Sequence, residues 1–463
     1  MYDPLISNLE KNIHDFRLWQ EKTVKDNQFL CKSIPFSESS EWYFDNGKLI
    51  HQTNGFFALV GIAAEARHSE LNGREQIIIL QRQIALNSFL IRKGPSGIEF
   101  LFQGRVEPGN IYGMQLAPTV QSTETNYKRL HGGKPTPLLG YFLKEHLSGV
   151  IYDELQSEEA TRYVGKYNRN LIVQIDFDME VEDHENFRWL DLDHIRSFVI
   201  ADNILNTDAR SVISCMNWDL LVDEHLPFDR HPVGSFGFAL QESYSTTVDN
   251  SKCTAYDLLS WLTKLRVQCG LQTRIKHLDE VRNWIIEKDR IRELEYQRGF
   301  EARQYLVQAS GREVPTWDQP LIFSHGIGRL TLVCQEKDNI LHFLVQASHE
   351  IGFLEGVQIS SSISIPPGEH IHSNDKVGRF LIEIIDSRKD VKIIQQCRQS
   401  EEGGRFYQDE NIYEIVLLDP SINVPEHDFY RWTSLSQLRE LVKIPGILSI
   451  ELRDVMTLLL AYI

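Results

Sequence analysis

The sequence matches itself at a fixed offset of 243 residues, and this internal repeat limits the possible folds more than any other feature. The segment 76–211 aligns with 319–454 without an insertion. Within it, Gln156-Ser-Glu-Glu159 recurs as Gln399-Ser-Glu-Glu402, and Arg188-Trp189 recurs as Arg431-Trp432. A solenoid would need at least three short repeats, so a single long repeat predicts one duplicated module.

The repeat divides the chain of 463 residues into two parts of similar size. We predict an N-terminal module over 1–216, a connector over 217–250 and a C-terminal module over 251–463. The connector is rich in Asp, Pro, Gly and Ser. Strands followed by segregated helices within each module predict an α+β fold with antiparallel or mixed sheets and flanking helices, rather than a doubly wound parallel sheet.

Local patterns predict several elements of the first module. Two strand-like segments, 88–93 and 98–102, flank the turn sequence Gly94-Pro-Ser-Gly97, which predicts a β-hairpin over 88–102. Apolar runs at 150–155 and 171–177 predict two further strands. Between them, the Ser-Glu-Glu start of 157–167 has the pattern of a helix N-terminus, because it offers a capping hydroxyl and then carboxylates in the first turn.

Composition and charge exclude several classes of partner. The net charge of −17 at pH 7 argues against a nucleic acid, although a local cationic pocket for an anionic substrate remains possible. No apolar stretch reaches the roughly 18–20 residues that cross a bilayer, and the first residues do not have the pattern of a signal peptide. The six cysteines form no CxxC pair, which is typical of reduced thiols. We expect a cytoplasmic protein without a membrane partner.

Common catalytic motifs are missing from the sequence. It contains no G-x-G-x-x-G, no G-x-x-x-x-G-K-[ST] and no G-x-S-x-G, which argues against a nicotinamide dehydrogenase, a P-loop enzyme and a serine hydrolase. Arg292-Glu-Leu294 followed by Gly299 is part of a Nudix hydrolase motif, but Tyr296 and Gln297 stand where that motif needs carboxylates for its metal. We therefore predict neither a metal nor a redox cofactor.

Residues that differ between the two copies are candidates for chemistry, since residues kept in both are candidates for the fold. The sharpest difference lies in the Gly- and Pro-rich segment 118–135, where the first copy brings an imidazole, a phenol, an amide and a lysine together. An exposed loop without a catalytic role is the alternative. The residues that change are His131, Tyr127 and Asn126, which align with Asn374, His370 and Glu369.

A second candidate group follows from helical spacing. Glu158 and Arg162 stand four residues apart and would form an ion pair on one helix face, although such pairs contribute only about 0.3–0.5 kcal/mol. Lys166 and Arg169 extend this face in the first copy only. A cationic face present in one copy is what a diphosphate requires, and a solvated surface is the alternative.

These segments resemble the NDP-hexose 2,3-dehydratase family. The resemblance implies two tandem Nudix-like modules, a homodimer, and chemistry in one module while the other is vestigial. One departure is that the motif Trp-x-Gln-Pro, expected in both copies, survives only as Trp317-Asp-Gln-Pro320. The segments that carry the resemblance are 44–57, 107–110, 118–135, 156–158, 166–170, 311–320 and 400–407.

The resemblance also implies a reaction. The substrate would be a dTDP-4-keto-6-deoxyhexose, which loses its C3 proton and then its C2 hydroxyl, and the resulting 3,4-diketo-2,6-dideoxyhexose would pass to a 3-ketoreductase. This hydro-lyase chemistry needs a base, a proton donor and hydrogen-bond donors around the enolate oxygen, but no cofactor. Two alternatives stay open: a non-catalytic protein that binds nucleotide sugars or acts as a scaffold, and another lyase or an epimerase acting on a related keto-sugar.

The predicted site residues follow from these motifs. We expect His131 to act as base or acid, because imidazole titrates near neutral pH. Glu158 is the second candidate if burial raises its pKa, and Tyr127 completes the catalytic set. The predicted substrate-binding residues are His51, Glu107, Asn110, Thr119, Gln121, Asn126, Lys134, Gln156, Ser157, Arg162, Lys166, Arg169 and Asn170.

Overall fold

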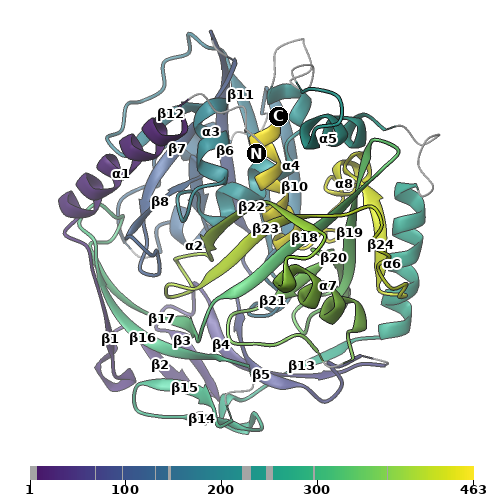
Figure 1. The fold of residues 1–463 in the computed structure, drawn as a ribbon. Helices are drawn as coiled ribbons and strands as arrows, with labels where there is room; N and C mark the ends of the chain where they lie inside the picture. The colour runs from purple at the N-terminus through teal and green to yellow at the C-terminus, as the bar shows by residue number, and fades with distance from the viewer. Residues whose placement is uncertain are drawn as a thin grey trace.

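The computed structural model describes residues 8–67, 69–95, 97–130, 132–143, 147–221, 231–246, 254–295, 298–372 and 374–463. In these residues the chain forms two seven-stranded and two five-stranded β-sheets with helices packed around them (Figure 1). Most strand pairs are antiparallel, and each seven-stranded sheet contains one parallel pair. The predicted α+β class with mixed sheets is confirmed.

The two seven-stranded sheets are the two copies of the repeat. The first has the order β10-β11-β6-β7-β12, and the second has the corresponding strands in the order β22-β23-β18-β19-β24. Each sheet has two further short strands: β8 pairs with β7 and β9 with β6 in the first, and β20 pairs with β19 and β21 with β18 in the second. The first sheet contains β6 (Ala85–Gly94), β7 (Gly97–Val106), β8 (Met114–Ala117), β9 (Val120–Ser122), β10 (Val150–Ser157), β11 (Tyr167–Ile175) and β12 (Phe187–Asp191). The second contains β18 (Gly328–Lys337), β19 (Ile340–His349), β20 (Val357–Ser360), β21 (Ile363–Ile365), β22 (Val391–Ser400), β23 (Glu410–Leu418) and β24 (Tyr430–Ser434).

The two five-stranded sheets exchange a strand between the copies. Strand β1 (Leu30–Ile34) pairs with β16 (Phe300–Gln308) of the second copy, and β13 (Gln272–Lys276) pairs with β4 (Ala58–Glu65) of the first. Each copy therefore completes a sheet of the other. The remaining strands of these sheets are β2 (Trp42–Asp45), β3 (Lys48–His51), β5 (Glu75–Leu80), β14 (Trp284–Ile286), β15 (Arg290–Glu293) and β17 (Thr316–Ser324).

Turn residues explain several hairpins. Asn46 and Gly47 both have positive φ, at 45° and 71°, and connect β2 to β3. A two-residue turn with positive φ at both positions matches the twist of an antiparallel pair, and Asn-Gly is its preferred sequence. The hairpin predicted over 88–102 is also confirmed, as β6 and β7.

The helix predicted over 157–167 is wrong, because these residues form the connection between β10 and β11. Strand β5 supplies the competing backbone partners. The amide of Ile79 donates to the Arg162 carbonyl at 2.8 Å, and the amide of Val164 donates to the Ile79 carbonyl at 3.1 Å. Glu158 accepts a hydrogen bond from Asn168 Nδ2 at 2.6 Å instead of facing solvent in a first helical turn.

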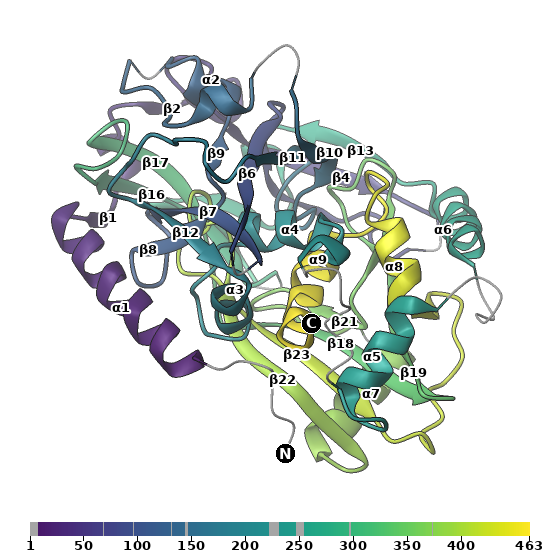
Figure 2. The same ribbon diagram turned by 90° about the horizontal axis from the view of Figure 1, so that it is seen from above.

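Helices α4 (Thr207–Cys215) and α9 (Ile450–Met456) pack on each other at the centre of the molecule (Figures 1 and 2). Arg210 of α4 donates to the Ser400 carbonyl at 2.9 Å, and its repeat counterpart Arg453 donates to the Ser157 carbonyl at 2.6 Å. Both arginines are fully buried, so their recurrence has a structural cause. The other helices are α1 (Leu9–Asp26), α2 (Glu124–Tyr127), α3 (Leu192–Val199), α5 (Phe236–Ser245), α6 (Ala255–Cys269), α7 (Lys376–Ser387) and α8 (Leu435–Leu441).

Helix α1 is the longest of these helices, and it is amphipathic rather than apolar. Within the ranges given above, no helix is both long enough and apolar enough to cross a membrane.

Candidate active site

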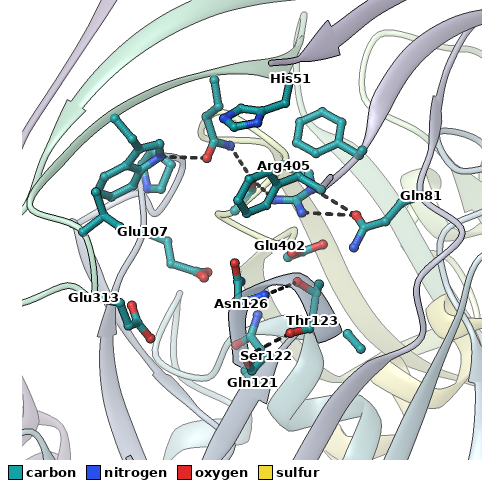
Figure 3. Close-up of a pocket in the computed structure, with 18 of the residues that line it drawn as sticks. His51, Gln81, Glu107, Gln121, Ser122, Thr123, Asn126, Glu313, Glu402 and Arg405 are labelled. Atoms are coloured by element: carbon teal, nitrogen blue, oxygen red, sulfur yellow. Dashed lines mark hydrogen bonds between the residues drawn. The ribbon is translucent and has the colours of Figure 1, made fainter. Parts of the chain in front are cut away.

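A cavity of about 260 Å³ opens in the first copy and is lined by both halves of the chain (Figure 3). Buried polar side chains converge in it from several elements, which is typical of a binding or catalytic pocket. The first copy contributes His51, Gln81, Glu107, Gln121, Ser122, Thr123, Asn126 and Lys166, among others. The second copy contributes Arg312, Glu313, Trp317, Gln319, Glu402 and Arg405.

Glu107 places a carboxylate in this cavity directly after strand β7. Arg105, the second-to-last residue of that strand, donates from Nε to Glu107 Oε1 at 2.7 Å. The other carboxylate oxygen, Oε2, is buried and has no hydrogen-bond partner among the described residues. One oxygen is thus held in place by a cation, and the second is free to accept a proton.

His51 ends strand β3 and is buried beside the rings of Trp42 and Phe56, whose centroids lie 5.5 Å and 4.6 Å from its own. Burial lowers the pKa of His51, although nearby Asp318 acts in the opposite direction. The imidazole is therefore neutral near neutral pH. The Thr53 amide donates to Nδ1 at 3.2 Å, so we assign the ring proton to Nε2.

Arg405 brings a cation into the cavity from the loop between β22 and β23. Its guanidinium lies over the Phe57 ring, 4.3 Å from the centroid, and donates to Gln81 Oε1 at 3.2 Å. In the described part of the chain Arg405 has no carboxylate within ion-pair distance. The same loop supplies Glu402, which accepts a hydrogen bond from Tyr163 at 2.6 Å.

Strand β17 of the second copy forms another wall of the cavity. Trp317 Nε1 donates to Gln319 Oε1 at 2.9 Å, and Gln319 Nε2 donates to the Gly404 carbonyl at 2.7 Å. These bonds fix the indole and the amide relative to the loop that carries Arg405 (Figure 3).

Lys166 is a second cation at the cavity, and it is buried. Burial lowers its pKa to about 8, while Glu158 acts in the opposite direction. Its ammonium donates to the Gln83 carbonyl. Glu158 interacts with this lysine but does not itself line the cavity. Burial, reinforced by the negative charge of Glu402, raises the pKa of Glu158 to about 7.

The structure brings five of the predicted site residues together. They are His51, Glu107, Gln121, Asn126 and Lys166, all of which line the cavity. The predicted base or acid His131 lies outside the described residues. The other predicted side chains, all within the described ranges, do not line this cavity: Tyr127, Asn110, Thr119, Lys134, Gln156, Ser157, Glu158, Arg162, Arg169 and Asn170.

Several of these side chains instead make buried contacts within the fold. Thr119 donates to the Leu101 carbonyl at 2.5 Å, and Asn110 donates to the Arg105 carbonyl at 3.1 Å. Asn170 contacts Ser211 of helix α4 at 3.3 Å. Two residues reach the second copy: Gln156 donates to the Val442 carbonyl at 2.8 Å, and Ser157 donates to Gln358 at 2.8 Å.

The predicted cationic face of Lys166 and Arg169 does not form, because strand β11 begins at Tyr167. Arg169 makes two 2.6 Å bonds to the carboxylate of Asp153 on neighbouring strand β10, away from the cavity. Lys134 borders a separate cavity of about 200 Å³, which shares Arg105, Arg312 and Glu313 with the first.

Comparison with known protein families decides the classification. A family model described as NDP-hexose 2,3-dehydratase matches residues 13–216 and 255–459, which together make up most of the chain. The chain belongs to the NDP-hexose 2,3-dehydratase family. The resemblance stated from the sequence is thereby confirmed.

Three relatives match this family member over most of its length. All three are named dTDP-4-dehydro-6-deoxy-alpha-D-glucopyranose 2,3-dehydratase. The protein of Saccharopolyspora spinosa is 30% identical over 95% of this chain and 90% of its own length. The protein of Amycolatopsis orientalis is 28% identical over 97% and 90%, and that of Streptomyces violaceoruber is 28% identical over 95% and 95%. Among solved structures, the C. elegans Ap4A hydrolase is 12% identical and covers 26% of this chain and 88% of its own, but a TM-score of 0.18 supports no conclusion about the fold.

The second copy of this 2,3-dehydratase family member has a corresponding cleft, but the chain fills it with its own side chains. Its volume is about 90 Å³. The carboxylate of Glu369, the counterpart of Asn126, lies 3.5 Å from Arg162, 3.6 Å from Arg74 and 3.8 Å from Arg298. Arg162 is the counterpart of Arg405, so each of these arginines serves the cleft of the other copy.

The counterpart of Glu107 is also altered in the second copy. Ser348 stands where the first copy has Arg105, so Glu350 has no equivalent ion pair among the described residues, and its carboxyl group accepts a 3.3 Å hydrogen bond from the serine. Burial raises the pKa of Glu350 to about 8, although Arg74 acts in the opposite direction. This carboxyl group is therefore largely protonated at neutral pH.

Sequence reasoning missed the residues that the second half contributes to the first cavity, above all Arg405, Glu402, Trp317 and Gln319. Two signals pointed to them. The Trp-x-Gln-Pro motif was kept only in the second half, and the segment 399–405 was kept in both. In this family member the surviving motif lines the open cavity, whereas Arg74, the counterpart of Trp317, lines the closed cleft.

Proposed function

We propose that this family member is a hydro-lyase that removes water from C2 and C3 of a dTDP-4-keto-6-deoxyhexose in the cavity of the first copy. The buried Oε2 of Glu107, which has no hydrogen-bond partner among the described residues and shares its cavity with a neutral imidazole and with an arginine that has no carboxylate partner there, is the observation that carries this proposal. The names of the three relatives support the substrate class. The closed cleft of the second copy supports the choice of the first.

In the proposed reaction Glu107 acts as the base. The 4-keto group acidifies the C3 hydrogen, and Glu107 Oε2 takes this proton to leave an enolate across C3 and C4. The enolate expels the C2 hydroxyl, which takes the proton back from Glu107 and leaves as water. The enol that results, with its double bond between C2 and C3, becomes the 3,4-diketo-2,6-dideoxyhexose. One carboxyl group thus moves the proton both ways, and no second acid is required.

His51 and Arg405 are suited to the developing charge on the C4 oxygen. A neutral imidazole with its proton on Nε2 can donate a hydrogen bond to a carbonyl oxygen without giving up the proton. A half-buried guanidinium without a carboxylate partner among the described residues can stabilise an oxyanion, because fewer water molecules compete for it than at the surface. Gln121 and Asn126 line the same cavity and can hydrogen-bond to the sugar hydroxyls.

The nucleotide part of the substrate would extend toward the neighbouring cavity. Arg312 lines both cavities, and its side chain is 18% exposed. We place the diphosphate at this arginine, since a guanidinium matches the geometry of phosphate oxygens. The nucleoside then lies in the cavity of about 200 Å³ that Lys134 borders, which keeps a substrate-binding role for that lysine.

A coupled assay tests the proposal. The protein is incubated with dTDP-4-keto-6-deoxyglucose, a 3-ketoreductase and a nicotinamide cofactor, because the diketo product is too labile to accumulate. The expected product is a nucleotide sugar lighter by one oxygen atom, since the loss of water is followed by the gain of two hydrogens. Recovery of unchanged substrate would contradict the proposal in favour of a binding or scaffold protein, and an isomer of equal mass would indicate an epimerase.

Four further properties belong to the same proposal. We expect a homodimer, a cytoplasmic location, a product handed to a 3-ketoreductase, and modules of the Nudix-like type with boundaries at 216 and 250. The family resemblance supports these expectations, and size-exclusion chromatography with light scattering tests the first of them.

A further inference from the structure

The cleft of the second copy has the architecture of an anion-binding site with a carboxylate of the chain inside it. Arg162 and Arg405 are equivalent in the repeat, and their guanidinium groups lie over equivalent rings, Phe300 at 3.8 Å and Phe57 at 4.3 Å. The two clefts therefore present a cation in the same way. They differ in what faces that cation.

In the second cleft the facing group is Glu369, which three arginines surround. Arg74 and Arg162 are both more than nine-tenths buried. Two of these arginines come from the first copy, while Glu369 and Arg298 come from the second, so the cluster also links the two halves. In the first cavity the equivalent position holds Asn126, which has no charge to offer Arg405.

The fit of Glu369 to its arginines is incomplete. All three ion-pair distances, from 3.5 to 3.8 Å, exceed those of good hydrogen bonds. The NH2 groups of Arg74 and Arg162, and Oε1 of Glu369, are buried without a hydrogen-bond partner among the described residues. Buried donors of this kind are costly to leave unpaired, and the long distances show that the Glu369 carboxylate does not satisfy them, so a larger oxyanion could contact the arginines more closely.

We infer that Glu369 is an internal ligand, and that the second cleft keeps a latent binding site for a phosphate-type oxyanion which this carboxylate occupies. Arg74 and Arg162 would bind the oxyanion if the carboxylate were removed. The chain accordingly binds a single nucleotide sugar, in the first cavity. The exchange of Asn126 for Glu369 is what separates an open site from a closed one.

Isothermal titration calorimetry with inorganic pyrophosphate tests this inference on the full chain. Glu369→Ala should bind one more pyrophosphate per chain than the wild type, and the double variant Glu369→Ala/Arg162→Met should lose that gain. Turnover by Glu369→Ala should stay near the wild-type value, because Glu369 lies outside the first cavity. Equal pyrophosphate stoichiometry in the wild type and Glu369→Ala would overturn the inference, whatever the catalytic activity of the protein.

Two further variants keep the test decisive if Glu369→Ala folds poorly. Glu369→Gln retains the shape of the side chain without its charge, and added pyrophosphate should raise its thermal unfolding midpoint more than that of the wild type. An equal rise in both proteins would also overturn the inference. Asn126→Glu copies the closing carboxylate into the first cavity, where it would face Arg405 and not Arg312, so it should lower kcat at least tenfold while the affinity for dTDP changes little. Unchanged turnover would count against the inference.

Discussion

Arg105 Nε donates to Glu107 Oε1 at 2.7 Å, whereas the repeat counterpart of this pair, Ser348 and Glu350, has no positive charge. The exchange of Arg105 for Ser348 therefore has a clear consequence. Glu107 is held by a cation, whereas Glu350 has no such cation and its burial favours the protonated form. The cation orients Glu107 and leaves its other oxygen buried without a hydrogen-bond partner among the described residues. The repeat supplies internal controls, because Glu107, Asn126 and Trp317 each have a counterpart that lines the second cleft.

Arg405→Met should lower kcat by about 10² to 10³-fold, as expected when a donor to a developing oxyanion is removed. The affinity for dTDP should change little, because we place the diphosphate at Arg312. Steady-state kinetics and dTDP titration measure the two effects separately. Arg398→Met is a matched control, since this arginine lies on the same strand-loop unit with an exposed side chain. Equal losses in both variants would contradict the role of Arg405.

Arg169→Ala should leave kcat and KM close to the wild-type values, because its guanidinium is bound to Asp153 away from the cavity. The pair is partly exposed, so its loss should cost no more than about 1 kcal/mol of stability. Kinetics on the coupled assay check the first expectation and chemical denaturation the second. A large rise in KM would instead restore Arg169 to the diphosphate site that its sequence position suggested.

Glu350 should make the protein less stable as the pH rises. Its pKa is raised by folding to about 8, so folding favours the protonated form. The stability that this group contributes is complete below its ordinary unfolded pKa and is lost as the pH rises through about 8. Glu350→Gln stays neutral and should therefore gain thermal stability relative to the wild type above this pH. A difference in unfolding midpoint that does not grow with pH would contradict the assignment.

The halves 1–250 and 251–463 should not fold separately. In the half 1–250, strand β1 would lose its partner β16, and β4 would lose β13. In the half 251–463, β13 and β16 would lose these same contacts. Each half would also leave a cleft without its arginine. Separate expression should give aggregated halves, and co-expression should restore some activity. A soluble and active 1–250 fragment would show that the second half is dispensable.

Much of the fold was accessible from the sequence because local patterns agree with the final structure. The 243-residue offset gave the two copies, and Asn46-Gly47 marked a hairpin. The segment 157–167 could not be assigned in this way. Its Ser-Glu-Glu start has a capping pattern, but its structure is decided by the backbone of Ile79, which lies far away in the sequence, and by the side chain of Asn168 on the following strand.

The candidate site was only partly predictable, for a related reason. His51, Glu107 and Asn126 were identified because they belong to the first copy, where the chemistry was expected. Arg405 and Trp317 line the same cavity although they belong to the second copy. Arg162, which belongs to the first copy, instead contacts Glu369 in the cleft of the second copy. A repeat in one sequence reveals which residues are equivalent, but not that the two modules exchange them across their interface.

The variants Glu107→Gln and Glu350→Gln, compared in the coupled assay, test the central claim most directly. General acid–base groups contribute about 10² to 10⁴-fold to rates, so Glu107→Gln should lose at least about 10²-fold in kcat and should no longer exchange the C3 hydrogen of the substrate with solvent deuterium. Glu350→Gln should turn over like the wild type. The reverse result, with Glu107→Gln active and Glu350→Gln inactive, would place the reaction in the second cleft and contradict the account.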